Sequence, residues 1–241
     1  MTTFVAIHGA FRGVWSWDLV ATELRELGHH LLAPDLPGMG SGTQQHGEVP
    51  RPRITLSDWV GTVERCVAEA GPSCCLVGHS MGGVVVQAAL GSLSGRVAHA
   101  VVIDSPQITV GQRAIDVSSP VPIDPAILPA EDAWLPATPV SEVQGFRSAE
   151  LRDWVNARLC ATPFGPQLDP CPEGSSPSAP LQPTFVFCSH TPAGYPSQLT
   201  RQRFEEEGYD FLEIDSGHDA PLLAPRVVAE LLTSQVASGG E

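Results

Sequence analysis

The feature that most constrains the fold of this chain is the hexapeptide G-H-S-M-G-G at residues 78–83. It follows a short apolar run at residues 74–77, which predicts a buried strand, and leads into small and apolar residues at 81–90, which predict a helix. A G-x-S-x-G motif in this setting is typical of a sharp turn that lifts the serine hydroxyl above a sheet, and its glycines leave room for the strained backbone. We therefore predict that Ser80 is a nucleophile. The alternative interpretation is a glycine-rich tight turn without chemistry.

The rest of the chain alternates apolar runs with amphipathic stretches, a pattern that indicates a parallel sheet covered by helices. Further apolar runs predict strands at residues 4–8, 30–34, 97–103, 184–188 and 209–214. Apolar residues at helical spacing predict helices at residues 16–27, 56–70, 148–159 and 225–237. The sequence therefore predicts the α/β class, with a mostly parallel sheet and helices on both of its faces.

The texture of the sequence changes between residues 106 and 180, where prolines are dense and periodicity is weak. The strand and helix pattern resumes beyond this segment, and a long loop-rich insertion in a compact domain is usually functional. We therefore predict one domain over residues 1–241, with a core formed by 1–105 and 181–241 and an inserted cap at about 106–180. Enzymes of the α/β class often fold a chain of 241 residues as one domain.

The chain carries 13 basic and 27 acidic residues, for a formal net charge of −14. Such a chain is repelled by phosphate backbones and anionic membranes, so neither nucleic acid nor a membrane is an expected partner. All of the basic residues are arginine, which excludes Schiff-base chemistry on a lysine and a phosphate-binding lysine. The expected partner is a small-molecule substrate, and the sequence leaves the oligomeric state open.

The cysteines lack the spacing of a zinc site and predict free thiols packed in the core of a cytoplasmic protein. They are Cys66, Cys74, Cys75, Cys160, Cys171 and Cys188. A bridge between Cys160 and Cys171 is the alternative. The first residues lead straight into an apolar strand without a basic leader, and no apolar run approaches the roughly 18 residues of a membrane span. We expect a cytoplasmic location and neither a cofactor nor a metal ion.

A second motif, S-G-H-D at residues 216–219, lies between the last predicted strand and the last predicted helix. In enzymes with this kind of serine turn, the catalytic residues follow the chain order serine, acid, histidine. His218 is the only histidine after His190, so we predict that it takes the proton of Ser80 and returns it to the leaving group. The alternative interpretation is a histidine in a surface loop.

A third motif, I-H-G-A-F at residues 7–11, lies at the end of the first predicted strand. A loop at this point supplies one N–H group to an oxyanion hole, and the residue after the nucleophile supplies the other. We therefore predict the N–H groups of Ala10, or in its place Phe11, and of Met81 as oxyanion donors. We expect His8 to brace this loop rather than to act as a base. An ordinary glycine between a strand and a loop is the alternative interpretation of the motif.

These motifs resemble a known family. The stretch at residues 4–42, the G-H-S-M-G-G turn and the S-G-H-D-A-P-L segment at 216–222 are similar to the α/β-hydrolases that include plant methylesterases, hydroxynitrile lyases and bacterial esterase-like relatives. The resemblance is close over about residues 1–105 and 181–237 and poor across the predicted cap. It implies an α/β-hydrolase fold and the same roles for the serine, the histidine and the oxyanion donors named above.

The acid of the catalytic triad departs from the family's pattern. The family places an aspartate just after the penultimate strand, but the corresponding loop at residues 189–197 reads S-H-T-P-A-G-Y-P-S and contains no carboxylate. We predict that Asp104, at the end of a predicted strand, takes this role and orients His218. The alternatives are Asp215, Asp219, and a dyad held by water or a backbone carbonyl. If it has no catalytic role, Asp104 is a strand-end residue that caps a turn.

Five aromatic residues are candidates for the substrate pocket because they lie in the loop after the first strand and in the cap. They are Phe11, Trp134, Phe146, Trp154 and Phe164. Packing within the cap is the alternative for each of them. The cap has no readable motif, so the sequence does not identify the substrate.

Together these features predict a serine hydrolase that cleaves an ester, thioester or lactone of a small organic molecule through an acyl-enzyme on Ser80. One alternative is a cyclase or another tailoring enzyme of a biosynthetic pathway, which transfers the acyl group within its substrate. A second is a hydroxynitrile lyase, although the family's lyases have a threonine where this chain has Ala10 and use a lysine that this chain lacks. A third is a binding protein without catalysis.

Overall fold

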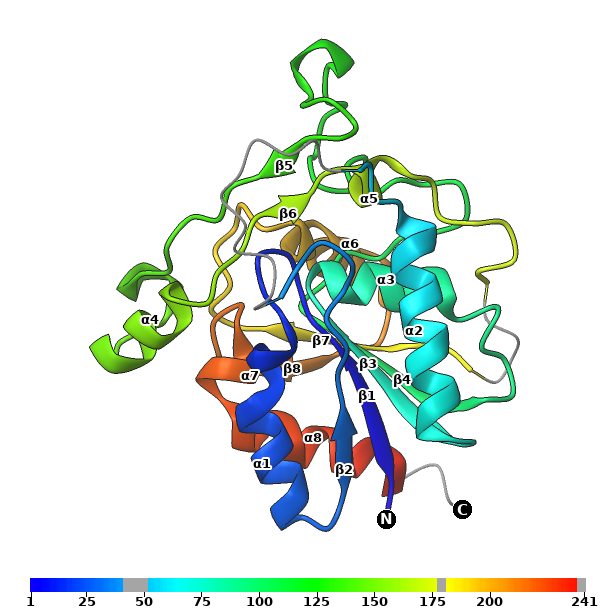
Figure 1. Ribbon diagram of the computed structural model, residues 1–241, viewed down its shortest axis with the longest axis vertical. Coiled ribbons are helices and arrows are strands. Elements are labelled where there is room, and N and C mark those ends of the chain that lie inside the picture. The colour runs from blue at the N-terminus through cyan, green and yellow to red at the C-terminus, as the bar shows by residue number, and fades with distance from the viewer. Residues whose placement is uncertain (41–51, 177–180, 238–241) are drawn as a thin grey trace.

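The computed structural model describes residues 1–40, 52–176 and 181–237, so the ends of the similar N-terminal stretch and of the predicted cap lie outside the described residues. Within these ranges, six strands form one parallel sheet in the order β2-β1-β3-β4-β7-β8 (Figure 1). The strands are β1 (Thr3–Ile7), β2 (His30–Leu32), β3 (Cys74–His79), β4 (Val97–Ile103), β7 (Thr184–Cys188) and β8 (Leu212–Ile214). The predicted parallel sheet is confirmed. Because its strands run in the same direction, their carboxyl ends meet at one edge, where ligands bind in folds of this class.

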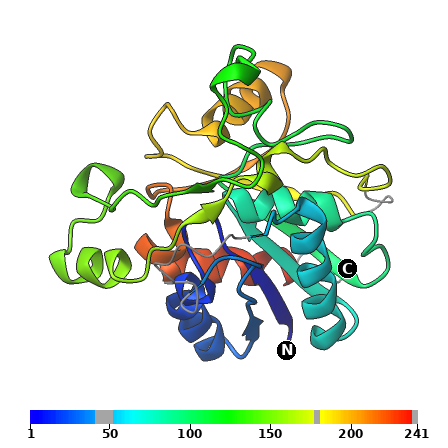
Figure 2. The ribbon, with the colours of Figure 1, turned by 45° about the horizontal axis from the view of Figure 1, so that its top comes forward.

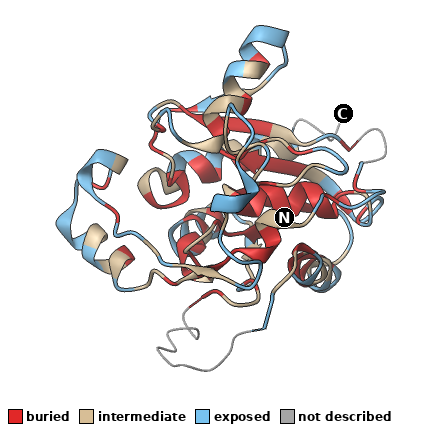
Figure 3. Ribbon diagram, turned by 90° about the horizontal axis from the view of Figure 1, so that it is seen from above, coloured by how far each residue is buried: buried red, intermediate tan, exposed pale blue. Residues whose placement is uncertain are grey.

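Helices cover both faces of this sheet. On one face, α2 (Leu56–Ala70), α3 (Met81–Ala89) and α6 (Pro196–Glu207) enclose an apolar core with side chains of β1, β3, β4 and β7. On the other face, α1 (Asp18–Glu26) and α8 (Pro225–Ala237) enclose a second core. The predicted arrangement of helices on both faces is therefore confirmed, and the buried residues gather in the middle of the molecule (Figure 3).

Local signals determine where α2 begins and ends. The Thr55 hydroxyl accepts a hydrogen bond from the Asp58 N–H, and the Asp58 carboxylate accepts one from the Thr55 N–H, which caps the start of the helix. Gly71, with a φ of +84°, ends it in a conformation that favours glycine. The bounds predicted for this helix are confirmed, and so are those of β4, β7 and α8.

Some predicted elements differ from the observed ones. The helix predicted at residues 16–27 begins with a 3-10 turn, η1 (Val14–Trp17), before α1. The strands predicted at 30–34 and 209–214 are shorter in the structure, because β2 and β8 are the two edge strands and each pairs on one side only. The sequence does not predict α6, because this helix is mostly polar and buries few of its side chains.

The segment between β4 and β7 lies over the carboxyl edge of the sheet (Figures 1 and 2). Its elements are η2 (Pro125–Ile127), β5 (Trp134–Leu135), η3 (Glu142–Gln144), α4 (Ala149–Asn156), β6 (Thr162–Pro163) and α5 (Gly165–Leu168). The helix predicted at residues 148–159 corresponds to α4, whereas the antiparallel pair of β5 and β6 has no signal in the sequence. None of the helices in the described ranges combines the length and the hydropathy that a membrane crossing requires.

The turn between β3 and α3 brings its backbone close to two neighbouring strands. The Ser80 N–H donates a hydrogen bond to the Ile103 carbonyl, at the end of β4, at 3.0 Å. Gly82 faces the end of β1 so closely that a Cβ there would lie 2.6 Å from the carbonyl oxygen of His8. Real Cβ atoms do not make such short contacts, and the partner is backbone rather than a side chain that can rotate away. This position therefore requires glycine.

We expect Gly82→Ala to lower the free energy of unfolding by about 1–3 kcal/mol, because the added methyl group forces α3 away from β1. Urea denaturation followed by circular dichroism measures this change. Gly61→Ala is the matched control, because a Cβ at Gly61, within α2, meets nothing nearer than the Arg65 guanidinium at 3.9 Å. The control is expected to stabilise the protein by up to about 1 kcal/mol, since alanine favours a helix over glycine. A Gly82→Ala variant as stable as this control would contradict the close approach.

Candidate active site

Ser80 lies in the turn between β3 and α3, at the carboxyl edge of the sheet. Its φ of +53° is in the left-handed region, a strained conformation for a residue with a side chain. The hydroxyl does not cap α3. It lies instead 3.0 Å from Nε2 of His218. The strained turn therefore presents the hydroxyl to the histidine rather than to its own helix.

His218 lies in the loop between β8 and α7 (Ala220–Leu223). Its Nδ1 is 2.5 Å from Oδ2 of Asp104, so one ring nitrogen faces a carboxylate while the other faces Ser80. The neighbouring His79 donates from Nε2 to the His218 carbonyl at 2.8 Å. Burial, together with the adjacent His218, lowers the pKa of His79 to about 4, so the His79 ring is neutral near pH 7. His218 is thus held both at its ring and at its backbone.

Asp104 directly follows β4, has a φ of +45° and is only 1% exposed. Its Oδ2 accepts hydrogen bonds from His218 and, at 2.6 Å, from the Thr191 hydroxyl, while Oδ1 accepts the Cys188 N–H at 3.2 Å. Burial opposes ionisation of this carboxyl group, but the hydrogen bond and the charge interaction with His218, with the other two donors, outweigh burial and lower its pKa. Asp104 therefore stands as an ionised carboxylate beside the imidazole.

The other two aspartates considered for the triad are engaged elsewhere. Asp219 pairs with a buried arginine. Asp215 has 90% of its side chain exposed and pairs with a histidine of the loop at 189–197. Among the described residues, the carboxylate that meets His218 is Asp104, as predicted. This contact establishes where the Asp104 carboxylate lies, whereas its catalytic role stays a prediction.

The loop after β1 lines the cavity beside Ser80. Phe11, at a φ of +63°, donates its N–H to the Thr162 hydroxyl at 2.6 Å, which removes this group as an oxyanion donor. The N–H of Ala10 has no acceptor among the described residues. Met81 is the first residue of α3, where N–H groups lack partners within the helix and carry partial positive charge. Ala10 and Met81 line the same cavity as Ser80. Their role as oxyanion donors stays a prediction.

His8 braces this loop, as expected from the sequence. It is fully buried, and its Nδ1 donates to the Gly9 carbonyl at 2.9 Å. Its Nε2 accepts the Leu36 N–H at 3.1 Å. Because a backbone N–H can only donate, Nε2 is the unprotonated nitrogen, and burial lowers the pKa of the ring in favour of this neutral form. Both ring nitrogens are thus occupied by backbone groups, away from Ser80.

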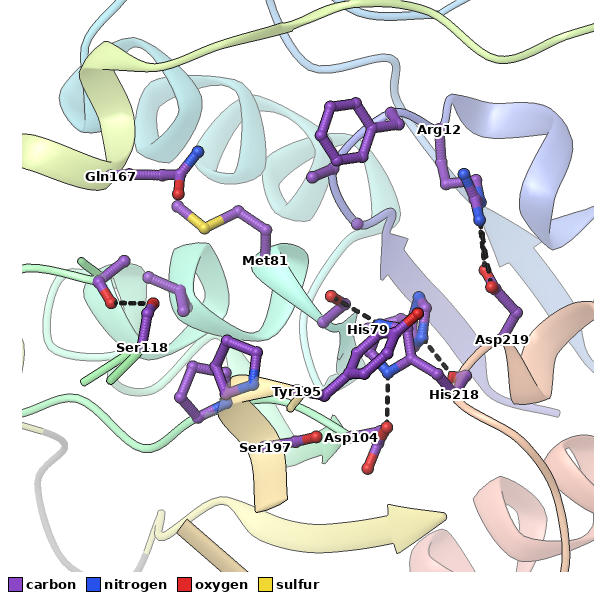
Figure 4. Close-up of a pocket in the computed structure, with 18 of the residues that line it drawn as sticks. Arg12, His79, Met81, Asp104, Ser118, Gln167, Tyr195, Ser197, His218 and Asp219 are labelled. Carbon is purple, nitrogen blue, oxygen red and sulfur yellow. Dashed lines mark hydrogen bonds and ion pairs between the residues drawn. The ribbon is translucent and has the colours of Figure 1, made fainter. Parts of the chain in front are cut away.

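These groups open onto a cavity of about 350 Å³ (Figure 4). Loops that follow β1, β3, β4 and β8 form one side of it. The segment between β4 and β7 contributes uncharged side chains to the lining, namely Ser118, Leu135, Thr138, Gln144 and Gln167. A cavity of this size, with a few polar groups on a largely apolar wall, admits a small organic molecule.

Of the five aromatic residues predicted for the pocket, Phe11 lines this cavity, whereas Trp134, Phe146, Trp154 and Phe164 do not. Phe146 is fully buried in a cluster with Trp15, and Trp154 packs edge-on against the same Trp15 at 5.3 Å. Phe164 is 3% exposed at the start of α5, and the Trp134 ring lies against Gly38, where an added Cβ would be 3.1 Å from Cζ3 of the ring. The prediction for these four residues is corrected accordingly, because their rings are used for packing.

Two polar residues of the lining were not predicted from the sequence. Tyr195 precedes α6, and Gln144 lies in the segment between β4 and β7. They are 51 positions apart and belong to no motif. Tyr195 does lie in the loop where the family has its acid, and this correspondence is the one signal that points to it.

A buried ion pair joins the loop after β1 to the loop that carries His218. Arg12 donates from Nε and Nη2 to the two carboxylate oxygens of Asp219, both at 3.1 Å (Figure 4). The two residues are 8% and 3% exposed. Burial opposes ionisation of Asp219, but the charge of Arg12 and, after it, the neighbouring histidines outweigh burial and lower the pKa of Asp219. The pair therefore brings two charges to the cavity wall and leaves neither unpaired.

The cysteines offer neither a bridge nor a metal site. None of the six is joined in a disulfide and all are buried, so the alternative of a bridge between Cys160 and Cys171 is wrong. Burial raises the pKa of Cys188, beside Asp104, and keeps its thiol protonated. Within the described residues there is no group of three or more histidine, cysteine or carboxylate side chains that could hold a metal ion.

The sequence profile of the Alpha/beta hydrolase family matches residues 4–231 of this chain. A carbendazim hydrolyzing esterase from Nocardioides sp. (strain SG-4G) is 26% identical over 259 residues, which cover 97% of this chain and 99% of the relative. Methyl jasmonate esterase 1 from Vitis vinifera is 33% identical over 104 residues, which cover 42% of this chain and 38% of the relative.

Solved structures are similar over nearly the whole chain. Tomato methylketone synthase I complexed with 2-tridecanone has a TM-score of 0.74 at 19% identity, over 98% of each chain. A pyrethroid hydrolase from Sphingobium faniae JZ-2 has a TM-score of 0.72 at 19% identity, also over 98% of each chain. At this level of identity the similarity concerns the fold.

We expect Arg12→Met to lower the free energy of unfolding by about 3–5 kcal/mol at pH 7, because it leaves the Asp219 carboxylate buried without its partner. The double variant with Asp219→Leu is expected to lose less than the sum of the two single variants, since removing both charges leaves neither unpaired. Urea denaturation of the wild type and the three variants measures both effects. Strict additivity of the two losses would contradict the ion pair.

The contribution of this pair is also expected to depend on pH. Since the pKa of Asp219 is lowered in the folded protein, the stabilisation is complete above the ordinary carboxyl pKa of about 3.9 and is lost as the pH falls through the lowered value. The difference in stability between wild type and Arg12→Met should therefore shrink below about pH 4. Arg226→Met, which removes a half-exposed partner of Glu230, is the control and should change stability far less. A difference that stays constant down to low pH would be inconsistent with this assignment.

Proposed function

Because this chain belongs to the alpha/beta hydrolase family, we propose that it hydrolyses an ester, thioester or lactone of a small organic molecule through an acyl-enzyme on Ser80. The observation that carries the proposal is the meeting of three side chains from three strand ends. Oγ of Ser80 lies 3.0 Å from one ring nitrogen of His218, and Asp104 lies 2.5 Å from the other. A relative similar over 97% of this chain is named an esterase, which supports ester hydrolysis among the reactions of this fold.

In the proposed reaction, Nε2 of His218 takes the hydroxyl proton of Ser80 as Oγ attacks the carbonyl carbon. The N–H groups of Ala10 and Met81 bind the negative charge that develops on the carbonyl oxygen. His218 then gives its proton to the leaving oxygen or sulfur, which releases the alcohol or thiol and leaves the acyl group on Ser80. Water attacks this acyl-enzyme with His218 again as the base, and the carboxylic acid departs.

Asp104 is proposed to orient the imidazole during these steps. By accepting Nδ1–H, its carboxylate leaves Nε2 unprotonated and directed at the serine. When His218 is protonated in the transition state, the adjacent negative charge stabilises it. The hydroxyl of Thr191 supports this role, because it donates to the same carboxylate oxygen and restrains its position.

We propose that the substrate is uncharged. The ionised side chains of the described lining already have partners: Arg12 pairs with Asp219, and the Asp104 carboxylate accepts a hydrogen bond from His218. A substrate carboxylate would find no free cation there, and it would approach a chain with a net charge of −14. The substrate can be searched for directly with a panel of esters that differ in acyl length. The panel includes methyl jasmonate and carbendazim, after which two relatives are named.

We further propose that residues 106–180 act as a cap within a single domain. The described part of this segment lies over the carboxyl edge of the sheet (Figure 2) and supplies lining residues such as Leu135 and Gln167. A cap of this kind restricts the entry of water and shapes the pocket. The absence of a disulfide among the six cysteines, all of which lie in the described residues, supports a cytoplasmic location, because reducing compartments disfavour disulfides.

We expect Ser80→Ala to lower kcat on every accepted ester by about 10⁴-fold or more, because the acyl-enzyme can no longer form. A fluorophosphonate probe followed by intact-protein mass spectrometry should label the wild type once and this variant not at all. Ser92→Ala, at an exposed serine, is the control and should keep both activity and labelling. Mass analysis of the product should show the addition of one water, whereas cyclisation adds none. Turnover near the wild-type level in Ser80→Ala would refute the proposal.

We expect Asp104→Asn to lower kcat by up to about 10⁴-fold, and by less than Ser80→Ala, because the imidazole loses its orientation and its counter-charge. Steady-state kinetics on the best ester of the panel measures this loss. Asp215→Asn is the matched control, since Asp215 is exposed and pairs with His190. Should Asp104→Asn leave kcat unchanged, the role of the acid would return to Asp215, Asp219 or water.

A further inference from the structure

The mechanism above does not use Tyr195, although this residue lies directly beside the base. Its ring packs against the His218 ring with centroids 4.4 Å apart and planes tilted by 50° (Figure 4). Tyr195 is half-buried, precedes α6 and lines the cavity. The Tyr195 ring therefore lies beside the imidazole that, in the proposed reaction, gives its proton to the leaving group.

The hydrogen bonds of Gln144 define the orientation of the Tyr195 hydroxyl. Oε1 of Gln144 accepts the backbone N–H of Ser141 at 2.9 Å and lies 3.3 Å from the Ser141 hydroxyl. A backbone N–H can only donate, so the atom that faces it must be the amide oxygen. Nε2 of Gln144 is therefore the atom that faces Tyr195, and it donates to the phenolic oxygen at 3.3 Å.

The turn that carries Gln144 is fixed to the rest of the molecule. Its Glu142 pairs with Arg152 at 3.0 Å, and the same guanidinium donates to the Phe146 carbonyl at 2.7 Å. On the other side, the turn packs against the loop of His218, where a Cβ at Gly217 would lie 2.8 Å from the Gln144 carbonyl oxygen. The amide donor is thus held in place before any ligand arrives.

A phenolic hydroxyl that accepts from an amide keeps its own proton for another partner. Among the described residues, the bond from Gln144 is the one hydrogen bond that the Tyr195 hydroxyl makes, and no acceptor there takes its proton. Since Tyr195 lines the cavity, an acceptor atom of a ligand bound there can take this proton in place of solvent. The site therefore presents one uncharged donor beside the base.

We propose that Tyr195 donates a hydrogen bond to an acceptor atom in the leaving group of the substrate, so that the enzyme prefers esters whose alcohol part carries an ether oxygen or an aromatic nitrogen. This inference rests on the proposed function. His218 returns its proton to the leaving oxygen, so the alcohol part of the substrate must lie beside the imidazole, against which Tyr195 packs. A neutral donor suits the uncharged substrate that the paired charges of the cavity favour.

The test compares pyridin-3-ylmethyl and benzyl esters of one acid, the acyl group that the panel turns over fastest. The two alcohols have nearly the same shape, but only the first has an acceptor nitrogen. We expect Tyr195→Phe to lower the ratio of kcat/KM for the first ester over the second by about 10-fold, as the loss of one neutral hydrogen bond predicts. Tyr209→Phe is the matched control, because it removes the hydroxyl of the other tyrosine of the chain, which is 57% exposed.

Gln144→Glu is a second variant that leaves the tyrosine intact. Its carboxylate can still accept the Ser141 N–H, but its other oxygen now accepts the Tyr195 proton instead of donating to the phenol. We expect the ratio to fall as it does in Tyr195→Phe, because the donor is consumed within the protein. The ratio of kcat/KM for the two esters cancels any effect of the new charge that acts on both of them. The measurement is made at pH 8, where the pyridine nitrogen is neutral.

A ratio that stays at the wild-type value in both variants would overturn the inference. So would an equal loss on the two esters in Tyr195→Phe, since that result would assign the hydroxyl to the support of His218 rather than to the substrate. In either case the labelling of Ser80 by the fluorophosphonate probe would persist, and the proposed function would stand. Absence of that labelling together with absence of turnover of both esters would overturn the proposed function and, with it, this inference.

Discussion

The hydrogen bond from the Ser80 N–H to the Ile103 carbonyl, 3.0 Å long, ties the serine turn to the strand that ends in Asp104. One strand further, the N–H of Asp104 itself donates to the Val186 carbonyl at 2.7 Å. The ladder of the parallel sheet thus continues one residue past the ends of β3 and β4, where both residues have a positive φ. Two strained residues that belong to different loops are thereby held at a fixed spacing, and His218 lies between their side chains.

The acid proposed for this site, Asp104, lies after a different strand from the acid of the family. The loop after β7 has no carboxylate, yet its Thr191 hydroxyl reaches the oxygen of Asp104 that faces His218. A carboxylate at the end of β4 and one after β7 can therefore approach the same ring nitrogen. Asp104 provides a buried carboxylate beside Nδ1, and the donors around it favour its ionisation over the opposing effect of burial.

Charged side chains elsewhere in the cavity are also paired or neutral. Arg12 and Asp219 neutralise each other, and burial keeps His79 neutral. Apart from these groups, Asp104 and His218, the polar side chains of the described lining are hydroxyls and amides. In a low-dielectric pocket, such neutral groups orient a ligand by hydrogen bonds without a large cost of desolvation. The paired placement of Gln144 and Tyr195 is one example, in which a segment far away in the chain supplies the second partner.

Much of this protein follows from local sequence. The strands, most helices, the serine turn and the S-G-H-D motif were predicted because each depends on residues within a few positions: apolar spacing, capping groups, or glycines where backbones approach. The sequence also proposed Asp104, but it kept Asp215 and Asp219 as alternatives, and the contact with His218 distinguishes their positions. Only the tertiary structure decided the lining of the cavity. In the structure, Arg12 pairs with Asp219, and Tyr195 packs against His218. The rings that pack within the protein instead of lining the cavity are those of Trp134, Phe146, Trp154 and Phe164. The physical reason is that these contacts join residues far apart along the chain, and such contacts leave no period or motif in the sequence.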